Sequence, residues 1–228
     1  MIPLVIGHRG APKQDIENSI GSFRAAVAAG ADGVELDVHS TLDGGLIVHH
    51  DELIGATHHI TRLTAEQVGA LRLANGEPVP TLPAVLQAVG KIRVFIEVKS
   101  LEPRFDARLL EAIDAGPNPQ GYAVHGFDHR IVRRLGLLRP GLQRWVLSSS
   151  YPVHPLQALA DAGATTLWQE HGLIDRPLTE TLHRAGMQVI AWTADDPQEM
   201  GRWIHLGVDG LCTNRPDVAR RVVDEGRR

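Results

Sequence analysis

The chain has 228 residues, 43% hydrophobic content and a formal net charge of −4 at pH 7. This length suits one well-buried core, and the slightly acidic balance argues against a nucleic-acid partner. A single cysteine, Cys212, excludes an intrachain disulfide and favours a reducing compartment, and no apolar run approaches the ~18 residues of a membrane helix. The start of the chain does not resemble a signal peptide, so we expect a cytoplasmic protein without stable membrane insertion.

Short apolar runs alternate with helical patterns along the chain. The first run, Leu4–Gly7, precedes an amphipathic pattern over Ser19–Ala29, which Ser19 can cap at its start and Gly30 at its end. The further strand candidates are Gly33–Val38, Leu46–His49, Ile92–Val98, Tyr122–Val124, Arg144–Leu147, Thr166–Trp168, Gln188–Trp192 and Gly210–Cys212. The helical patterns between them are Leu82–Val89, Phe105–Asp114, His129–Leu138, Pro155–Ala162, Pro177–Ala185 and Pro197–Leu206. The alternation predicts parallel strands with crossover helices, and we favour one (β/α)8 TIM barrel domain over residues 1–228, a fold that typically takes ~200–250 residues.

This reading gives one strand candidate more than an eight-stranded barrel needs. Leu46–His49 follows Val38 through a turn-rich stretch that is too short for a crossover helix. Either this segment lies on the rim, or one of the weaker central candidates is not a barrel strand, and periodicity leaves the choice open. Residues 51–80 are polar, contain a helical pattern over Ala65–Leu73, and are expected to form a small insertion over the catalytic end of the barrel.

Charged side chains repeat with a period of two inside two aliphatic runs. Glu35 and Asp37 alternate with Val and Leu in one run, and Glu97 and Lys99 alternate with Ile and Val in another. A strand turns alternate side chains to opposite faces, so each pair lies on one face while the aliphatic residues take the other. Buried carboxylates need neutralisation, and a hard divalent cation is the simplest neutraliser. We therefore predict a metal site, although Glu97 and Lys99 are also able to satisfy each other.

Two histidines follow the ends of predicted strands. His8-Arg9 ends the first strand, and His50-Asp51 follows Leu46–His49. In a TIM barrel the carboxyl ends of the strands carry the active site, where two imidazoles make an acid–base pair near neutral pH. Arg9 adds a planar fork suited to phosphate, and Lys99 adds a second positive charge. This set of groups suggests metal-assisted phosphoryl transfer.

Spaced polar positions over nearly the whole chain carry a family resemblance. The segments are His8-Arg9-Gly10, Glu17-Asn18-Ser19, Gly30 to Val38, Thr41 to Gly44, His50-Asp51, Thr81-Leu82, Ile96 to Lys99, Trp192-Thr193, Gly207 to Gly210 and Thr213 to Pro216. In this order they resemble the signature of the glycerophosphodiester phosphodiesterases. Two departures are Gly126-Phe127, where relatives usually have Ser-Phe, and Asn214, where they usually have aspartate. The Asp195-Asp196 pair before Pro197 is expected to begin a helix.

The resemblance implies a TIM barrel that hydrolyses small glycerophosphodiesters to glycerol 3-phosphate and an alcohol with one divalent cation, Mg²⁺ or Ca²⁺. It implies His8 and His50 as the acid–base pair and Arg9 and Lys99 as phosphate ligands. Metal ligands by resemblance are Glu35, Asp37 and Glu97. It further implies that Glu17 and Asn18 position or buttress this shell and that Trp192 packs against the glycerol.

The reaction route and two rival functions stay open. A neighbouring glycerol hydroxyl attacks phosphorus to give a cyclic phosphate that water then opens, or water attacks directly. The first rival is a phospholipase D-like or lysolipid-specific phosphodiesterase on the same barrel, and the second is a catalytically silent phosphodiester-binding relative. The leaving alcohol, the choice between Mg²⁺ and Ca²⁺, and the oligomeric state are not determined by the sequence.

Overall fold

The structure, a computed structural model, describes residues 2–226. Its centre is a ring of parallel strands in the order β1-β11-β10-β9-β8-β7-β6-β2, and pairing between β1 and β2 closes the ring. The ring strands are β1 (Leu4–Gly7), β2 (Gly33–Ser40), β6 (Arg93–Ser100), β7 (Tyr122–His125), β8 (Gln143–Ser148), β9 (Thr166–Glu170), β10 (Gln188–Trp192) and β11 (Gly210–Thr213). The predicted eight-stranded parallel barrel is confirmed.

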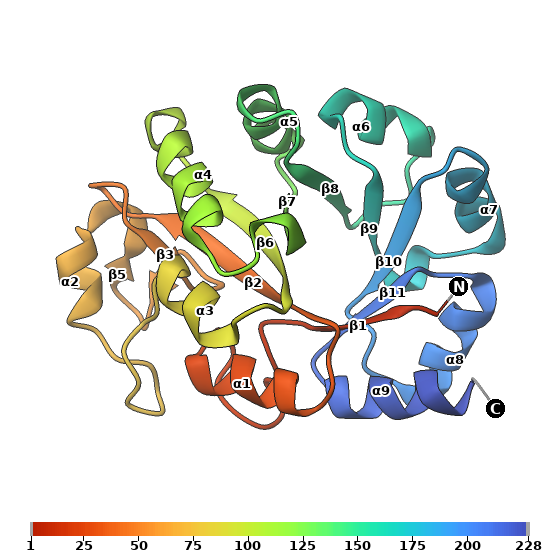
Figure 1. The fold of residues 1–228 in the computed structure, drawn as a ribbon, viewed down its shortest axis with the longest axis horizontal. Coiled ribbons are helices and arrows are strands. Elements are labelled where there is room, and N and C mark those ends of the chain that lie inside the picture. Colours follow the sequence, from red (N-terminus) through yellow and green to blue (C-terminus); the bar gives the residue numbers. More distant parts are fainter. Residues whose placement is uncertain (1, 227–228) are drawn as a thin grey trace.

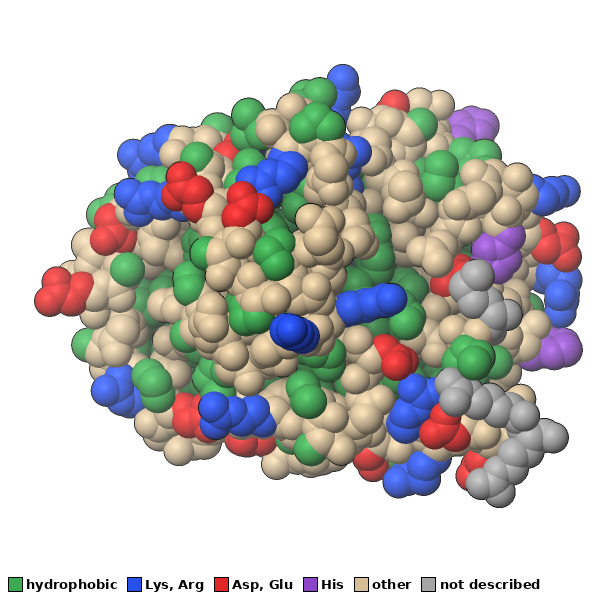
Figure 2. Space-filling model, viewed as in Figure 1, with side chains coloured by type: hydrophobic (Ala, Val, Ile, Leu, Met, Phe, Trp, Pro, Cys, Tyr) green, Lys and Arg blue, Asp and Glu red, His purple; other side chains and the backbone are tan. Residues whose placement is uncertain are grey.

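Helices cover the outside of the ring, as Figure 1 shows. They are α1 (Ile20–Ala28), α3 (Leu82–Val89), α4 (Asp106–Ala115), α5 (His129–Leu138), α6 (Pro155–Ala162), α7 (Arg176–Arg184), α8 (Pro197–Leu206) and α9 (Pro216–Glu225). Helix α9 was not among the predicted helices, although Val218, Ala219 and Val223 give it a buried stripe. Within residues 2–226, no helix is both long enough and apolar enough to cross a membrane. Acidic and basic side chains are interspersed over the face drawn in Figure 2, in keeping with the small net charge.

The surplus strand candidate lies outside the ring. β3 (Leu46–Val48) pairs antiparallel with the end of β2, with Val38 opposite Val48. An antiparallel return needs only a short turn, which explains why no crossover helix precedes it. All the central candidates are therefore barrel strands. The return also brings the chain back along β2, where the backbone N–H of His49 donates to the carbonyl of Asp37 at 3.1 Å.

The insertion over residues 51–80 lies beyond the carboxyl end of β2, beside β3 (Figure 1). It holds β4 (Leu53–Ile54), β5 (His58–His59) and α2 (Ala65–Gly69), and α2 starts in a capping box between Thr64 and Gln67. The expected helix over Ala65–Leu73 stops at Gly69, because the chain then folds back and the N–H of Leu73 bonds to the carbonyl of Glu77 at 2.8 Å. The segment is less polar inside than its composition suggested, since a small apolar cluster packs within it and against β3: Ile47, Ile54, Ile60, Val68 and Val79.

Side chains of β2 alternate between two environments, as predicted. Val34, Leu36 and Val38 face outwards into the main apolar cluster and are fully buried. Burial of such a side chain contributes about 1.5–3 kcal/mol, so these aliphatic residues fix the register of the strand. Glu35 and Asp37 are thereby turned towards the interior of the barrel.

Candidate active site

Three carboxylates converge at the carboxyl end of β2 and β6. Asp37 lies opposite Glu97 in the parallel pairing of the two strands, and Glu35 precedes Asp37 by one full strand period. One oxygen from each of the three side chains lies within 4.8 Å of the others, and all three residues are buried. No other group of acids, histidines or cysteines with this geometry occurs within residues 2–226.

The environment of these acids favours a cation between them. Burial, followed by the charges of its two neighbours, raises the pKa of Glu35 well above its ordinary value. Burial and the charge of Asp37 raise the pKa of Glu97 to about 7. Burial alone would raise the pKa of Asp37 too, but Arg9 and Lys99 lower it below its ordinary value. Since one buried oxygen of Asp37, Oδ1, also has no hydrogen-bond partner among the described residues, the three acids fit a divalent cation.

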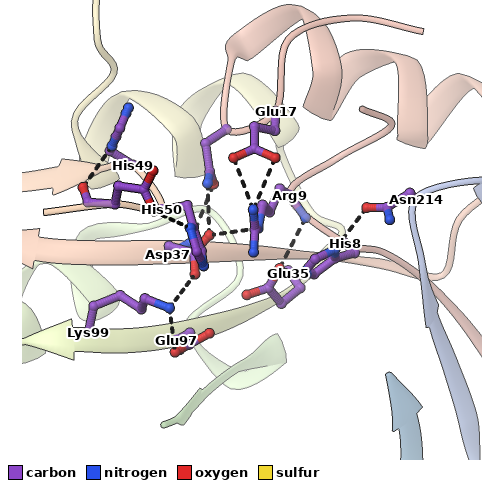
Figure 3. A network of polar contacts seen from close by, with 12 residues as sticks. His8, Arg9, Glu17, Glu35, Asp37, His49, His50, Glu97, Lys99 and Asn214 are labelled. Atoms are coloured by element: carbon purple, nitrogen blue, oxygen red, sulfur yellow. Dashed lines mark hydrogen bonds and ion pairs between the residues drawn. The ribbon is translucent and has the colours of Figure 1, made fainter. Parts of the chain in front are cut away.

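Lys99 faces two of the three acids. Its Nζ lies 3.0 Å from Oε1 of Glu97 and 3.6 Å from Oδ1 of Asp37 (Figure 3). The pairing of Glu97 with Lys99 that the sequence allowed is therefore present. This ion pair does not exclude a metal site, because Glu97 also belongs to the cluster of three acids.

Arg9 connects the carboxylates to the mouth of the site. Its backbone N–H donates to Oε2 of Glu35 at 3.0 Å, and its Nη1 lies 3.0 Å from both carboxylate oxygens of Glu17. Its Nε lies 3.3 Å from Oδ2 of Asp37. Glu17 is half exposed, so it holds the guanidinium from the solvent side.

Two residues of the loop between β1 and α1 adopt a left-handed backbone, with φ of 53° at Arg9 and 56° at Asn18. Such a conformation costs roughly 1–2 kcal/mol for an L-residue and marks a position that the surroundings hold in place. At Asn18 it directs Nδ2 to Oδ2 of Asp37 at 2.8 Å. Gly10 follows with φ of 92°, and a Cβ there would lie 2.4 Å from Oγ of Ser22, so only glycine fits.

His8 is held in one tautomer by a chain of side chains. Nδ2 of Asn214 donates to Oδ2 of Asp195 at 2.7 Å, which leaves Oδ1 of Asn214 to accept from Nδ1–H of His8 at 2.8 Å. The lone pair is then on Nε2, which lies 4.0 Å from Oε2 of Glu35. Burial and the charge of Arg9 lower the pKa of His8, so the ring is neutral near pH 7.

His50 has a similar arrangement on the other side of the acids. Its Nδ1 lies 2.8 Å from Oδ1 of Asp51, and this contact leaves Nε2 free. Its backbone is also fixed, because Nε2–H of His39 donates to the carbonyl of His50 at 3.0 Å. Nδ1 of His39 in turn accepts from Oγ of Ser100 at 3.0 Å. Both predicted acid–base histidines thus keep one ring nitrogen tied and the other available.

These groups open on one pocket with two unlike sides. The polar side comes from β1, β2, β6 and the segment after β3: His8, Arg9, Glu35, His50, Glu97 and Lys99. The other side comes from the remaining ring strands, β7 to β11, and the residues after them: His125, Phe127, Leu147, Trp168, Trp192 and Cys212. The predicted Trp192 belongs to this second side, with its ring 5.7 Å from that of Phe127. A larger hollow at the amino ends of the strands, lined by residues such as Arg93 and Gln143, lies away from these groups.

The structure adds residues that were not predicted for the site. Asp195 was expected only to start a helix, but Asp196 is the N-cap of α8 and Asp195 instead holds Asn214. His125 lines the pocket at the end of β7, and His39 supports the His50 backbone. All three residues end or follow barrel strands: Asp195, Asn214 and His125. The position of His8 at the carboxyl end of a strand made it a candidate, and the same criterion applied to these residues.

The chain matches a known family over most of its length. Residues 8–218 match the model of the glycerophosphoryl diester phosphodiesterase family. A glycerophosphodiester phosphodiesterase of Caldanaerobacter subterraneus subsp. tengcongensis is 32% identical over 242 residues, which covers 99% of this chain and 100% of the relative.

Solved structures share the fold over nearly their whole length. A glycerophosphodiester phosphodiesterase from Parabacteroides distasonis superposes with a TM-score of 0.89 at 27% identity, covering 100% of this chain and 99% of the other. An Oleispira antarctica phosphodiesterase in complex with its product sn-glycerol-3-phosphate superposes with a TM-score of 0.90 at 21% identity, covering 98% and 97%. The matched family model, the relative and the barrel agree, and the chain belongs to the glycerophosphoryl diester phosphodiesterase family.

Proposed function

We propose that this chain hydrolyses glycerophosphodiesters to glycerol 3-phosphate and an alcohol, in a reaction that requires one divalent cation. The observation that carries the proposal is a compact triad of buried acids flanked by His8 and His50, each with one ring nitrogen tied and the other free. The name of the Caldanaerobacter relative and the product held by the Oleispira enzyme support the same substrate class.

Glu35, Asp37 and Glu97 would hold the cation. Oxygen ligands of this kind suit Mg²⁺ and Ca²⁺. When bound, the cation would neutralise phosphate charge and relieve the mutual repulsion of the acids. Burial, together with that repulsion, raises the pKa values of Glu35 and Glu97.

The substrate phosphate would lie against Arg9 and Lys99. The guanidinium offers a planar fork to two phosphate oxygens, and the ammonium adds a point charge. Glu17 keeps the guanidinium in place, and Asn18 orients the central acid. Trp192 provides an aromatic wall for the glycerol unit.

His8 and His50 would move the protons. Nε2 of His8 takes the proton of the attacking hydroxyl, because its pKa is lowered and its lone pair is free. His50 protonates the oxygen of the leaving alcohol as the bond from phosphorus to that oxygen breaks. When the nucleophile is the neighbouring glycerol hydroxyl, the product is a cyclic phosphate, and water then opens it with the roles of the histidines reversed. An intramolecular nucleophile avoids much of the entropic cost of bringing water to phosphorus, which favours the cyclic route. A 2-deoxy substrate separates the routes, since unchanged turnover eliminates the cyclic one.

A coupled glycerol 3-phosphate assay over a panel of glycerophosphodiesters tests the function. We expect turnover that EDTA abolishes and that Mg²⁺ or Ca²⁺ restores. We expect it to fall roughly 10²- to 10⁴-fold in His8→Ala and His50→Ala but to persist in His58→Ala, an exposed histidine of β5. Chelator-resistant turnover would contradict the metal site. Turnover that survives both active-site substitutions would contradict the acid–base roles of His8 and His50, and no turnover with any diester would leave only a phosphodiester-binding role.

A second candidate substrate is favoured by the apolar side of the pocket. Phe127, at the rim of this wall, is 47% exposed, so an acyl chain of a lysolipid has apolar surface beside the phosphate position. A lysophospholipid in the same panel decides between the candidates. A higher kcat/KM for the lysolipid than for its deacylated counterpart would favour the phospholipase D-like function.

A further inference from the structure

His125 is a buried imidazole that the fold does not use. It ends β7, is 1% exposed, and packs its ring 4.4 Å from that of Trp168. Within residues 2–226, neither Nδ1 nor Nε2 has a hydrogen-bond partner. An unsatisfied buried polar group costs about 1–3 kcal/mol, so a partner from outside the chain that bonds to this ring would be stabilised by it.

The position of the ring indicates where that partner binds. His125 lies beside Glu97 in the pairing of β6 with β7 and lines the active-site pocket. Its Nε2 is 4.0 Å from Oε1 of Glu35, so it faces the reacting region. A neutral imidazole offers one donor and one acceptor nitrogen.

The divalent cation is not the partner that this geometry favours. The ligand atoms that lie within 4.8 Å of one another come from Glu35, Asp37 and Glu97, and His125 does not belong to that group.

The surroundings of His125 suit a neutral, oxygen-bearing group. The aromatic walls beside it include Trp168 and Trp192, and Nε1 of each indole is also buried without a hydrogen-bond partner among the described residues. A hydroxyl both donates and accepts, as a neutral imidazole does, whereas a phosphate oxygen only accepts. We propose that His125 hydrogen-bonds a hydroxyl of the glycerol unit and thereby selects glycerol-containing ligands, an inference that rests on the proposed function for the identity of the substrate.

Binding of two phosphate monoesters by calorimetry tests this role without turnover. Glycerol 3-phosphate and n-propyl phosphate have the same number of carbons, but only the first carries hydroxyls. In the wild type with Mg²⁺ we expect glycerol 3-phosphate to bind about 10- to 100-fold more tightly. In His125→Phe, which keeps an aromatic ring and removes both nitrogens, we expect this preference to fall by roughly 10-fold while n-propyl phosphate binds as before. His125→Gln, which retains a donor, should restore part of it, and the exposed His58→Phe should leave it unchanged.

Each alternative role predicts a different result. An undiminished preference in His125→Phe would overturn the proposal, and so would an equal loss of affinity for both ligands. A fall in Mn²⁺ affinity measured without phosphate ligand would assign His125 to the cation instead. Thermal melting establishes that each variant is folded. If the wild type prefers glycerol 3-phosphate but hydrolyses no diester, the proposed function fails while the hydroxyl contact stands.

Discussion

Asn214→Ala tests whether His8 depends on its neighbours for a single tautomer. The substitution removes the acceptor 2.8 Å from Nδ1 of His8 and also leaves Oδ2 of Asp195 without its 2.7 Å donor. A hydrogen bond contributes about 0.5–1.5 kcal/mol net, and leaving a buried partner unsatisfied costs about 1–3 kcal/mol. A loss of about 1.4–2.7 kcal/mol in the reactive arrangement corresponds to a 10- to 100-fold lower kcat. We expect KM to change little, because the phosphate contacts of Arg9 and Lys99 remain.

A double-mutant cycle makes this prediction specific. Steady-state glycerol 3-phosphate release would be measured for Asn214→Ala, His8→Ala and the double variant. If Asn214 acts through His8, its removal has no further effect once His8 is absent. The same fold loss in both backgrounds would refute the reasoning. Asn75→Ala serves as the control, because this exposed amide bonds to Asp15 in a different part of the surface.

Three further outcomes are expected. Glu35→Gln should lower turnover by at least ~10²-fold and weaken Mn²⁺ binding in calorimetry, because one charged ligand is lost; unchanged cation affinity would remove Glu35 from the site. Arg9→Lys should weaken inorganic phosphate binding roughly 10-fold, because a point charge does not reproduce the planar guanidinium, which contacts both Glu17 and Asp37. Wild-type affinity for phosphate in this variant would contradict a phosphate role for Arg9. Burial, together with the charge of Glu35, raises the pKa of the Cys212 thiol well above its ordinary value, so the thiolate is scarce at pH 8 and iodoacetamide should label Cys212 only after unfolding; rapid labelling of the folded protein would show that the thiol is accessible.

The acidic site was predictable because its carboxylates recur at the two-residue period of a strand. Glu35 and Asp37 alternate with aliphatic residues, and burial of Val34, Leu36 and Val38 on one face obliges the carboxylates to take the other. Helix caps were equally local. Ser19 accepts from the N–H of Ser22 at the start of α1, as its sequence position predicted.

Contacts between distant segments were not predictable in this way. Asn214 and His8 are separated by 206 positions and meet only because β1 and β11 are neighbours in the ring. From its position before Pro197, Asp195 was predicted only to begin a helix. Its hydrogen bond with Asn214 depends on the pairing of β10 with β11, which places the segments after these two strands side by side.

The amino-acid sequence by itself determined the strand–helix alternation, the inward face of β2 and β6, and the residues able to bind a cation and a phosphate. These features depend on side-chain period and chemistry, which act over a few residues. Only the tertiary structure decided that β3 lies outside the barrel, that Asp195 and Asn214 hold His8, and that His125 faces the pocket unpaired. Those outcomes depend on closure of the ring, which sets the distances between residues that no local pattern relates.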